Sequence, residues 1–350
     1  MQILLSKTAH ARIGPRLKAI APEDVELILV TPDGQFERDG APVPAESVDP
    51  DIAWLSIDAM RDGYMPIVLQ RLAASTRTKW VQSFLAGLDN PAFKQIIAKG
   101  ISLSKSSAQA VSIAEYITAH AFGRIVPIEA QREAQARKEW TRTPFREIGD
   151  TRWTMVGFGS IGYEVARRIK PYGVHLTVVR RDTDNRGLAD SVITLAEIAS
   201  ALPQSDVVVL ACSLNDETRH LANDAFFGAM KKNAILINIG RGALIEDAAL
   251  KRGLDRDQPG CAVLDVFEKE PLPTDSWMWE HPKVHVSAHT SPNGSGTVGR
   301  GDELFLDNLR RYLAGEKVSN EATRAEVGFD PMRNVGTAYT LWPISNSVPS

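Results

Sequence analysis

Short apolar runs alternate with helical stretches along most of this chain, and they do so in two separate series. The first series, in the N-terminal part, contains the β-rich runs QILLS, VELILVT, IAWLS, KWVQSF and GISLS. The second series contains WTMVGFG, LTVVRR, VVVLACS, AILINIG, CAVLDVF and VHVSAHT. Strands that alternate with helices in this way predict parallel sheets with helices on both faces. We therefore expect an α/β protein with two doubly wound, Rossmann-like parallel sheets.

Length and composition indicate a soluble protein of two domains. At 350 residues and 43% hydrophobic content, the chain is long enough to bury two cores. The longest apolar runs, such as VVVLAC at 207–212, are far shorter than the roughly 20 residues that a membrane span requires. The N-terminal segment MQILLSKTAHAR soon turns polar, so we expect neither a signal peptide nor a membrane partner.

Charge and cysteine content narrow the class of protein further. The net charge is −3 and basic residues are scattered among acids, which disfavours nucleic-acid binding. Cys212 and Cys261 lie in apolar, strand-like runs, so we expect buried free thiols and no disulfide. Free thiols are typical of a reducing compartment, and we expect a cytoplasmic location.

A glycine-rich turn joins the first strand of the second series to an amphipathic helix. It reads VGFGSIG at 156–162, with GxGxxG spacing. In this pattern the first glycine permits a tight turn, the second allows backbone to approach a pyrophosphate, and the third lets the helix pack closely on the strand. The helix would present its N-terminal amides to the phosphates. We therefore expect a dinucleotide to bind at Gly157, Phe158, Gly159, Ser160, Ile161 and Gly162.

The next strand ends in two arginines where an acidic residue would be expected. Folds that select NAD usually carry an Asp or Glu about twenty residues after the glycines, which binds the ribose 2′-hydroxyl. Here Arg180 and Arg181 take that place. A guanidinium can pair with a 2′-phosphate and stack on adenine, so we expect NADP(H) to be preferred and NAD(H) to remain possible. The alternative is a solvated basic pair that Asp182 and Asp184 neutralise.

Four further segments complete a recognisable pattern: AGLDN at 86–90, INIGRGALIED at 237–247, LDVFEKEPLP at 264–273 and SAHTSP at 287–292. Together with VGFGSIG, they resemble the D-isomer-specific 2-hydroxyacid dehydrogenases, a family that includes glyoxylate and hydroxypyruvate reductases. The resemblance implies a two-domain homodimer. It also implies that the cofactor domain is inserted into a discontinuous, flavodoxin-like substrate domain.

These patterns also predict where the domains begin and end. We expect a substrate-binding domain of residues 1–103 and 296–330, and a dinucleotide-binding domain of residues 104–295. Residues 331–350 have no period and are expected to form a tail or arm. Residues 104–140 are mostly helical, and their apolar face has no obvious home within one α/β domain. We therefore expect this stretch to hold the homodimer together.

The resemblance implies three catalytic residues. Arg241 matches the family's substrate arginine, Glu270 its glutamate and His289 its acid/base histidine. A guanidinium can bind the carboxylate of a 2-oxo acid and polarise the adjacent carbonyl. A histidine titrates near neutral pH, and a neighbouring carboxylate raises its pKa. The implied reaction passes a hydride from nicotinamide to the carbonyl carbon and a proton from His289 to the oxygen.

Further contacts are implied by the same resemblance. Backbone amides at Leu85, Ala86 and Gly87 are expected to bind the substrate carboxylate, with Arg241 and His289 also in the substrate site. Asp265 is expected to orient the nicotinamide carboxamide. The other expected cofactor contacts lie on loops after strands: Cys212, Ser213, Thr218, Ile239, Gly240, Arg241 and His289.

Other interpretations of the same residues stay open. Arg241 could bind a carbonyl at a strand end, and Glu270 could be an ordinary turn residue. His285 and His289 lie four residues apart on what reads as one strand, so their side chains would share a face. No third ligand accompanies this pair, and we expect no metal.

The expected class of activity follows from the motifs, and two departures from the family pattern leave it unchanged. Ser213 stands where a proline is usual, and SAH replaces TPH before the histidine, but neither change removes a reacting group. We expect a reductase of small 2-oxo acids, with glyoxylate and hydroxypyruvate as first candidates. An NAD-dependent D-2-hydroxyacid dehydrogenase and a dinucleotide-sensing, corepressor-like interaction protein are the alternatives.

Overall fold

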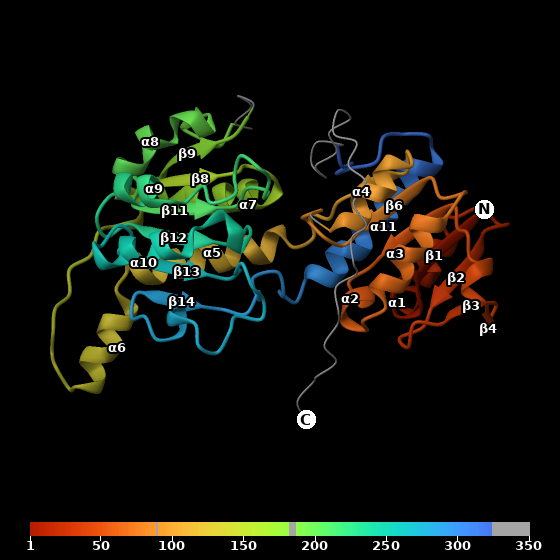
Figure 1. Cartoon of the computed structure of the whole chain (residues 1–350), viewed down its shortest axis with the longest axis horizontal. Coiled ribbons are helices and arrows are strands. Elements are labelled where there is room, and N and C mark those ends of the chain that lie inside the picture. Colours follow the sequence, from red (N-terminus) through yellow and green to blue (C-terminus); the bar gives the residue numbers. More distant parts are fainter. Residues whose placement is uncertain (89, 182–186, 324–350) are drawn as a thin grey trace.

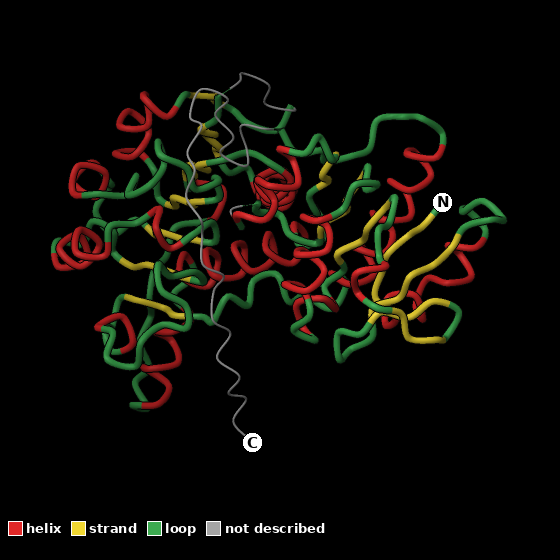
Figure 2. The backbone as a smooth tube through the Cα atoms, turned by 45° about the vertical axis from the view of Figure 1, so that its right-hand side comes forward, coloured by secondary structure: helices red, strands yellow, loops and turns green. Residues whose placement is uncertain are grey.

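A computed structural model describes residues 1–88, 90–181 and 187–323 of the chain. Within these residues, two seven-stranded sheets form two lobes that lie side by side (Figure 1). Figure 2 shows the strands of the two sheets in separate groups with helices around each. The predicted class, two parallel-sheet α/β domains, is confirmed.

The first sheet has the strand order β4-β3-β2-β1-β5-β6-β7. Its strands are β1 (Gln2–Ser6), β2 (Glu26–Val30), β3 (Phe36–Arg38), β4 (Ala41–Val43), β5 (Ile52–Leu55), β6 (Trp80–Ser83) and β7 (Ser102–Ser104). Strands β2, β1, β5, β6 and β7 are parallel, and their order is that of flavodoxin. Strands β3 and β4 add an antiparallel edge that was not predicted, because their three-residue sequences FER and APV contain charged residues or proline and no apolar run.

The helices that cover the first sheet are α1 (Lys7–Lys18), α2 (Asp58–Arg61), α3 (Met65–Ala74), α4 (Pro91–Ala98) and α11 (Thr297–Leu313). Successive strand residues point to opposite faces, so each face has its own core. Ile3 and Leu5 of β1 pack with α1 and α11, whereas Leu4 packs with α3 and α4. The ring of Phe305 on α11 stacks on Trp54 of β5 at 4.3 Å. Helix α11 therefore belongs to the first sheet although it follows the last strand of the second.

The second sheet has the order β10-β9-β8-β11-β12-β13-β14, and all of its pairings are parallel. Its strands are β8 (Arg152–Val156), β9 (His175–Val179), β10 (Ser191–Ile193), β11 (Val207–Leu210), β12 (Ile235–Asn238), β13 (Cys261–Leu264) and β14 (Val284–Val286). This is the Rossmann order with one strand added beyond β13. Six of these strands were predicted from the sequence, and the short edge strand β10 was not.

The helices of this lobe are α5 (Ala110–Ile125), α6 (Ile128–Ala136), α7 (Ser160–Ile169), α8 (Ile198–Ala201), α9 (Asp224–Ala229) and α10 (Asp247–Asp255). Helices α5 and α7 share one core with one face of the sheet, where Ile117 and Val165 are fully buried. Helices α8, α9 and α10 cover the other face through side chains such as Phe227 and Leu250.

The expectation that the apolar face of residues 104–140 lacks a home in the chain is wrong. Ile113, Ala114, Ile117 and Ala121 of α5 are buried in the same core as α7 and the second sheet. A surface of the sheet that the sequence does not reveal therefore covers this face. Helix α6, which follows Pro127, extends away from the lobe and buries only Ala134 (Figure 1).

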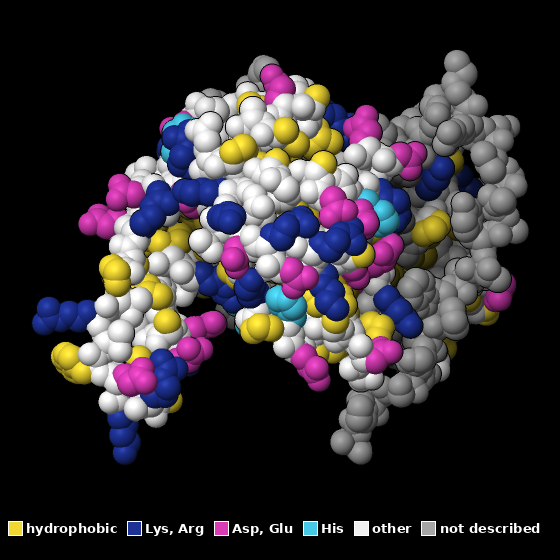
Figure 3. Space-filling model, turned by 60° about the vertical axis from the view of Figure 1, so that its left-hand side comes forward, with side chains coloured by type: hydrophobic (Ala, Val, Ile, Leu, Met, Phe, Trp, Pro, Cys, Tyr) yellow, Lys and Arg dark blue, Asp and Glu magenta, His cyan; other side chains and the backbone are white. Residues whose placement is uncertain are grey.

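The surface charges and the two cysteines can be compared with the expectations from composition. On the face seen in Figure 3, Lys and Arg side chains lie among Asp and Glu side chains. Cys212 and Cys261 are unpaired, but both are half-buried and not fully buried as expected. Among the described residues, no helix combines the length and the apolar character that crossing a membrane requires. The proposed tail at 331–350 lies outside the described residues.

Candidate active site

Apart from Leu85, Ala86 and Gly87, which follow β6 of the first sheet, the residues selected from the motifs converge on one edge of the second sheet. Each follows the carboxyl end of a parallel strand: the glycines follow β8, Arg180 follows β9, Cys212 follows β11, Arg241 follows β12, and the last loops follow β13 and β14. In open α/β sheets this edge is where ligands bind. The topology therefore brings together residues that are as far apart in sequence as Gly157 and His289.

In the glycine turn after β8, Gly157 and Gly162 pack tightly against other protein atoms, whereas Gly159 faces open space that a ligand could fill. Gly157 has φ +95°, and a Cβ there would lie 2.7 Å from the carbonyl oxygen of Ala211. A Cβ on Gly162 would lie 2.9 Å from the ring of Phe158, whose side chain is buried. A Cβ on Gly159 would meet nothing within 4 Å. The shape therefore fits a pyrophosphate above Gly159, at the N-terminus of α7.

Ser160 and Ile161 begin that helix, so their backbone amides belong to its first turn. Arg180 and Arg181 follow β9 directly, and the Arg180 amide donates to the carbonyl oxygen of Ile193 on β10 (3.0 Å). Asp182 and Asp184, which could neutralise the arginines, lie outside the described residues. Because both arginines follow the carboxyl end of β9, they lie at the same edge of the second sheet as the glycine turn that follows β8.

The loop after β11 carries three residues expected near a cofactor. Burial raises the pKa of the Cys212 thiol to about 11, so the thiol stays protonated at neutral pH. Thr218 is buried, and its hydroxyl donates to the carbonyl oxygen of Ser213 (2.8 Å) and accepts from the Asn215 amide (2.9 Å). The Thr218 side chain thus fixes the shape of this loop.

The turn that carries Arg241 is held by a side chain that the sequence analysis did not select. Asn238, fully buried at the end of β12, donates from Nδ2 to the Arg241 carbonyl (2.9 Å) and accepts from the Gly240 amide (3.1 Å). Ile239, between them, is buried. An amide at the end of an otherwise apolar strand was the available signal for this role.

Gly242 brings the Arg241 turn against the loop that carries Glu270. A Cβ on Gly242 would lie 1.9 Å from the backbone carbon of Phe267, so only glycine fits. The Phe267 amide donates to Glu270 Oε1 (2.9 Å), which orients the carboxylate. The position of Arg241 relative to Glu270 therefore depends on this close approach of two backbones.

Glu270 and His289 form a direct pair. His289 Nδ1 lies 2.9 Å from Glu270 Oε2, and both side chains are partly exposed at the strand edge. The hydrogen bond with Glu270 raises the pKa of His289, although burial and the charge of Arg241 oppose this rise. Burial raises the pKa of Glu270, but hydrogen bonds from His289 and Phe267 and the charge of Arg241 bring it below its usual value. The pair therefore favours a protonated imidazole beside an ionised carboxylate.

Asp265 organises the loop that presents His289. Its carboxylate is fully buried and accepts from Ser287 Oγ (2.6 Å), the Thr290 amide (2.8 Å) and the Ser291 amide (3.0 Å). Its carbonyl oxygen accepts from the His289 amide (2.9 Å). Both carboxylate oxygens thus accept hydrogen bonds from residues on either side of His289, so Asp265 fixes the conformation of the histidine loop.

The expectation that His285 and His289 share one strand is wrong. Strand β14 ends at Val286, and His289 adopts φ +50° in the turn that Asp265 holds. The chain bends at His289, after Ser287, whose hydroxyl also contacts Tyr116 of α5 (2.6 Å). Neither Tyr116 nor Ser287 was selected from the sequence, because contacts between distant elements leave no local pattern.

The loop after β6 carries the residues expected to bind a substrate carboxylate. The Phe84 amide donates to the Leu55 carbonyl (2.9 Å), and the Leu85 amide donates to Ser83 Oγ (3.0 Å). The Leu85 carbonyl accepts from the Ser106 amide (2.9 Å). These contacts fix the backbone up to Leu85 and leave Ala86, which is exposed, and Gly87 at the tip of the loop.

Comparison with known proteins gives a consistent assignment. The chain matches the family model described as "D-isomer specific 2-hydroxyacid dehydrogenase, NAD binding domain" over residues 119–291. It is 30% identical over 240 residues to 4-methyl-2-oxopentanoate reductase A of Aspergillus oryzae, which covers 67% of this chain and 71% of that protein. It is 27% identical over 278 residues to glyoxylate reductase of Korarchaeum cryptofilum, which covers 76% of this chain and 82% of that protein.

A similar fold occurs in solved structures. The structure of a D-isomer specific 2-hydroxyacid dehydrogenase from Xanthobacter autotrophicus Py2, in complex with NADPH and MES, matches with a TM-score of 0.74. The match covers 93% of this chain and 99% of that one, at 22% sequence identity. At this level of identity, the similarity concerns the fold alone.

Proposed function

Because this chain belongs to the D-isomer-specific 2-hydroxyacid dehydrogenase family, we propose that it is an NADPH-preferring reductase of small 2-oxo acids. Glyoxylate and hydroxypyruvate are the first candidate substrates, and D-2-hydroxy acids are the products. The observation that carries the proposal is the Glu270–His289 pair, with 2.9 Å between Oε2 and Nδ1, at the strand edge that also carries Arg241.

The cofactor site is assigned to the glycine turn and the loops beside it. The open space over Gly159 suits the pyrophosphate, and the amides of Ser160 and Ile161 would bind its oxygens at the helix N-terminus. Loops at Cys212, Ser213, Ile239 and Gly240 would line the path toward His289. When bound, the reduced nicotinamide supplies the hydride.

His289 is the proton donor in this proposal. The hydrogen bond with Glu270 raises the pKa of His289 and so favours the protonated imidazole, and Glu270 holds Nδ1, so Nε2 is left to face the substrate. As hydride adds to the carbonyl carbon, the carbonyl oxygen takes the Nε2 proton. The product is a hydroxyl group, and the imidazole is left neutral beside the carboxylate.

Arg241 and the loop after β6 bind the 2-oxo acid. The guanidinium of Arg241 pairs with the carboxylate and polarises the neighbouring carbonyl. The Leu85 amide is engaged by Ser83, so the remaining carboxylate oxygen is bound by the amides of Ala86 and Gly87. Asp265 contributes by holding the loop that presents His289, and this contribution does not require contact with the nicotinamide carboxamide.

Arg180 and Arg181 carry the preference for NADPH. They stand at the end of β9, where an acid would repel the 2′-phosphate of NADPH. A charge-assisted hydrogen bond contributes about 1.5–3 kcal/mol, so one or two such bonds correspond to roughly 10- to 10⁴-fold discrimination.

The domain division and the assembly are part of the same proposal. The substrate domain consists of residues 1–103 and 296–330, and the dinucleotide domain of residues 104–295. The enzyme is a homodimer, and residues 104–140 form its interface through α6 and its surroundings. The exposed side chains of Ile128 and Trp140 support this placement, since they are 45% and 97% exposed.

The test is a panel of 2-oxo acids assayed with NADPH and with NADH. We expect turnover of glyoxylate or hydroxypyruvate, with kcat/KM at least tenfold higher for NADPH. Arg180→Asp combined with Arg181→Ala should lower kcat/KM for NADPH, whereas the control Arg167→Ala, at an exposed position of α7, should not. Absence of turnover with every acid would refute the enzymatic proposal. Equal kcat/KM for both cofactors would refute the preference alone.

A further inference from the structure

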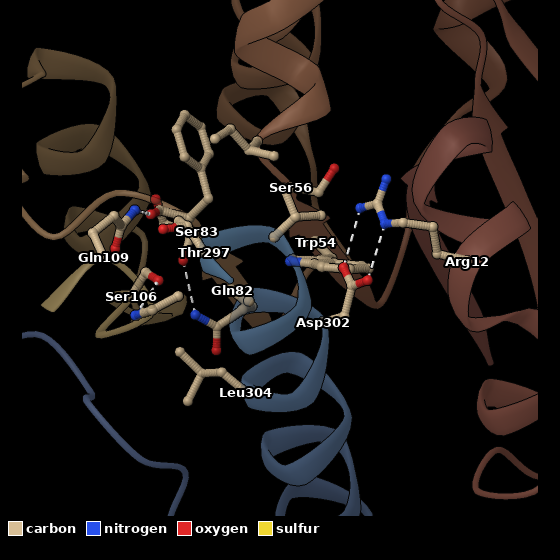
Figure 4. Close-up of a pocket in the computed structure, with 15 residues that line it drawn as sticks. Arg12, Trp54, Ser56, Gln82, Ser83, Ser106, Gln109, Thr297, Asp302 and Leu304 are labelled. Atoms are coloured by element: carbon tan, nitrogen blue, oxygen red, sulfur yellow. Dashed lines mark hydrogen bonds and ion pairs between the residues drawn. The ribbon is translucent and has the colours of Figure 1, made fainter. Parts of the chain in front are cut away.

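The guanidinium of Arg12 in the first lobe lies between two buried carboxylates, those of Asp58 and Asp302. Figure 4 shows its pairing with Asp302. Arg12 donates to both oxygens of Asp58 (3.1 and 3.0 Å) and to both oxygens of Asp302 (2.9 and 3.1 Å). Both aspartates are 4% exposed. The cluster joins α1, α2 and α11, which are far apart in sequence.

The charges in this cluster bind the three elements firmly. Burial raises the pKa of Asp58, but hydrogen bonds from Arg12 and Ser56 bring it below its usual value. The Arg12 pKa is raised, because hydrogen bonds to both aspartates outweigh the effect of burial. A buried carboxylate that loses its partner is strongly unfavourable, so neither aspartate can move away alone.

Asp58 is the first residue of α2, which adjoins the proposed substrate site. It follows β5 and accepts from Ser56 Oγ (2.7 Å). Leu55, at the end of β5, accepts from the amide of Phe84, in the loop that leads to Ala86 and Gly87. A shift of Asp58 would therefore move a wall of the site that binds the 2-oxo acid.

Asp302 lies on the segment that leads away from His289. Helix α11 begins at Thr297, directly after the loop that carries the histidine, and Asp302 is in its second turn. A cavity beside the cluster is lined from both sides, by Ser56 and Ser83 of the strand ends and by Thr297 of α11 (Figure 4). The cluster therefore lies where the substrate loops meet the helix that follows the histidine loop.

We propose that Arg12 is a positioning residue that fixes the loop after β5 relative to α11, and thereby sets the width of the 2-oxo acid site. The substrate part of this inference rests on the proposed function. The planar guanidinium suits this task because it donates four hydrogen bonds to the two carboxylates, whereas a lysine ammonium has only three N–H groups.

The test compares two neighbouring carboxylates on α11. Asp302→Asn breaks one side of the cluster, whereas Glu303→Gln breaks only the exposed pair with Arg16, one turn along α1. We expect Asp302→Asn to raise the KM for the 2-oxo acid about tenfold, with kcat and the KM for NADPH changed less than twofold. Arg12→Lys should raise the same KM, and Glu303→Gln should leave all three constants unchanged.

Hydrogen–deuterium exchange separates this inference from the proposed function, because it needs no turnover. Exchange in residues 56–63 should increase in Asp302→Asn and not in Glu303→Gln. Increased exchange without any wild-type activity would uphold the coupling and refute the proposed reaction. Unchanged exchange, or equal rises in the KM for acid and cofactor, would overturn the role of Arg12. If Asp302→Asn does not fold, the same criteria apply to Arg12→Lys.

Discussion

His289 and Glu270 control the pH range in which a reductase of this kind can work. Reduction needs the protonated imidazole, so its rate falls as pH rises through the His289 pKa. The hydrogen bond with Glu270 raises that pKa and extends activity toward alkaline pH. The effect of the carboxylate can be isolated, because glutamine has nearly the same shape.

We predict that Glu270→Gln moves the alkaline limb of the kcat/KM profile to lower pH. The neutral amide stabilises the imidazolium less than a carboxylate does, so the His289 pKa falls. The measurement is kcat/KM for reduction against pH, with a variant of the exposed Glu268 as a control. An unchanged limb in Glu270→Gln would mean that another group sets the pKa of the proton donor.

Asp265 offers a second prediction at this scale. In Asp265→Asn, the amide group faces a hydroxyl and two backbone N–H groups, so at least one buried donor loses its acceptor. Such a loss costs about 1–3 kcal/mol, and we expect kcat to fall roughly 10- to 10²-fold as the His289 turn loosens. The KM for NADPH should stay near its wild-type value. A selective rise in that KM would instead favour contact with the nicotinamide carboxamide.

At the scale of elements, two glycines that follow strands have different roles: Gly242 allows two backbones to pack closely, and Gly159 leaves space for a ligand. Gly242 has no room for a side chain, whereas Gly159 faces open space. Both belong to loops at the same edge of the second sheet, which makes them a matched pair.

We predict that Gly242→Ala and Gly159→Ala fail in different ways. The added methyl in Gly242→Ala must push the Phe267 backbone away, and a shift of about 1 Å in the Glu270 loop can lower kcat on the order of 10²-fold. It should also lower the melting temperature. Gly159→Ala should keep the wild-type melting temperature but raise the KM for NADPH, because its methyl occupies the pyrophosphate space. Similar thermal shifts in both variants would contradict this division.

The sequence predicted the long strands and the motif loops well, because period and glycine spacing are local properties. Helix α5 illustrates what it could not predict. Its apolar face was expected to await a second subunit, yet Ile117 is buried against α7 and the second sheet. His289 was expected on a strand with His285, but the amides of His289 and Thr290 donate to Asp265, on another loop, and hold His289 in a bend beyond the strand. Contacts between elements decided both outcomes.

At the scale of the whole molecule, loops of both sheets contribute residues to the proposed site. Arg241, Glu270 and His289 lie on loops that follow strands of the second sheet, and Ala86 and Gly87 lie on a loop that follows β6 of the first. Chain segments near residues 104–110 and 287–297 connect the two lobes. The motifs identified the residues on each side, but the link through Arg12 combines charges from three distant elements and appears only in the folded chain.

The segment 128–145, which begins with α6 and is called the arm below, carries large exposed apolar side chains. Ile128 is 45% exposed, and Phe145 and Trp140 farther along are 52% and 97% exposed. Large apolar side chains gathered on one projecting segment are typical of a surface that another chain covers. We therefore predict a homodimer of twice 38.3 kDa at micromolar concentration, measured by sedimentation. Ile128→Asp should produce monomers because it places a charge in the interface, whereas Ile67→Asp, at a position 41% exposed on α3, should leave the dimer intact. A wild-type protein that sediments as a monomer, or equal dissociation by both substitutions, would show that the arm is not the interface.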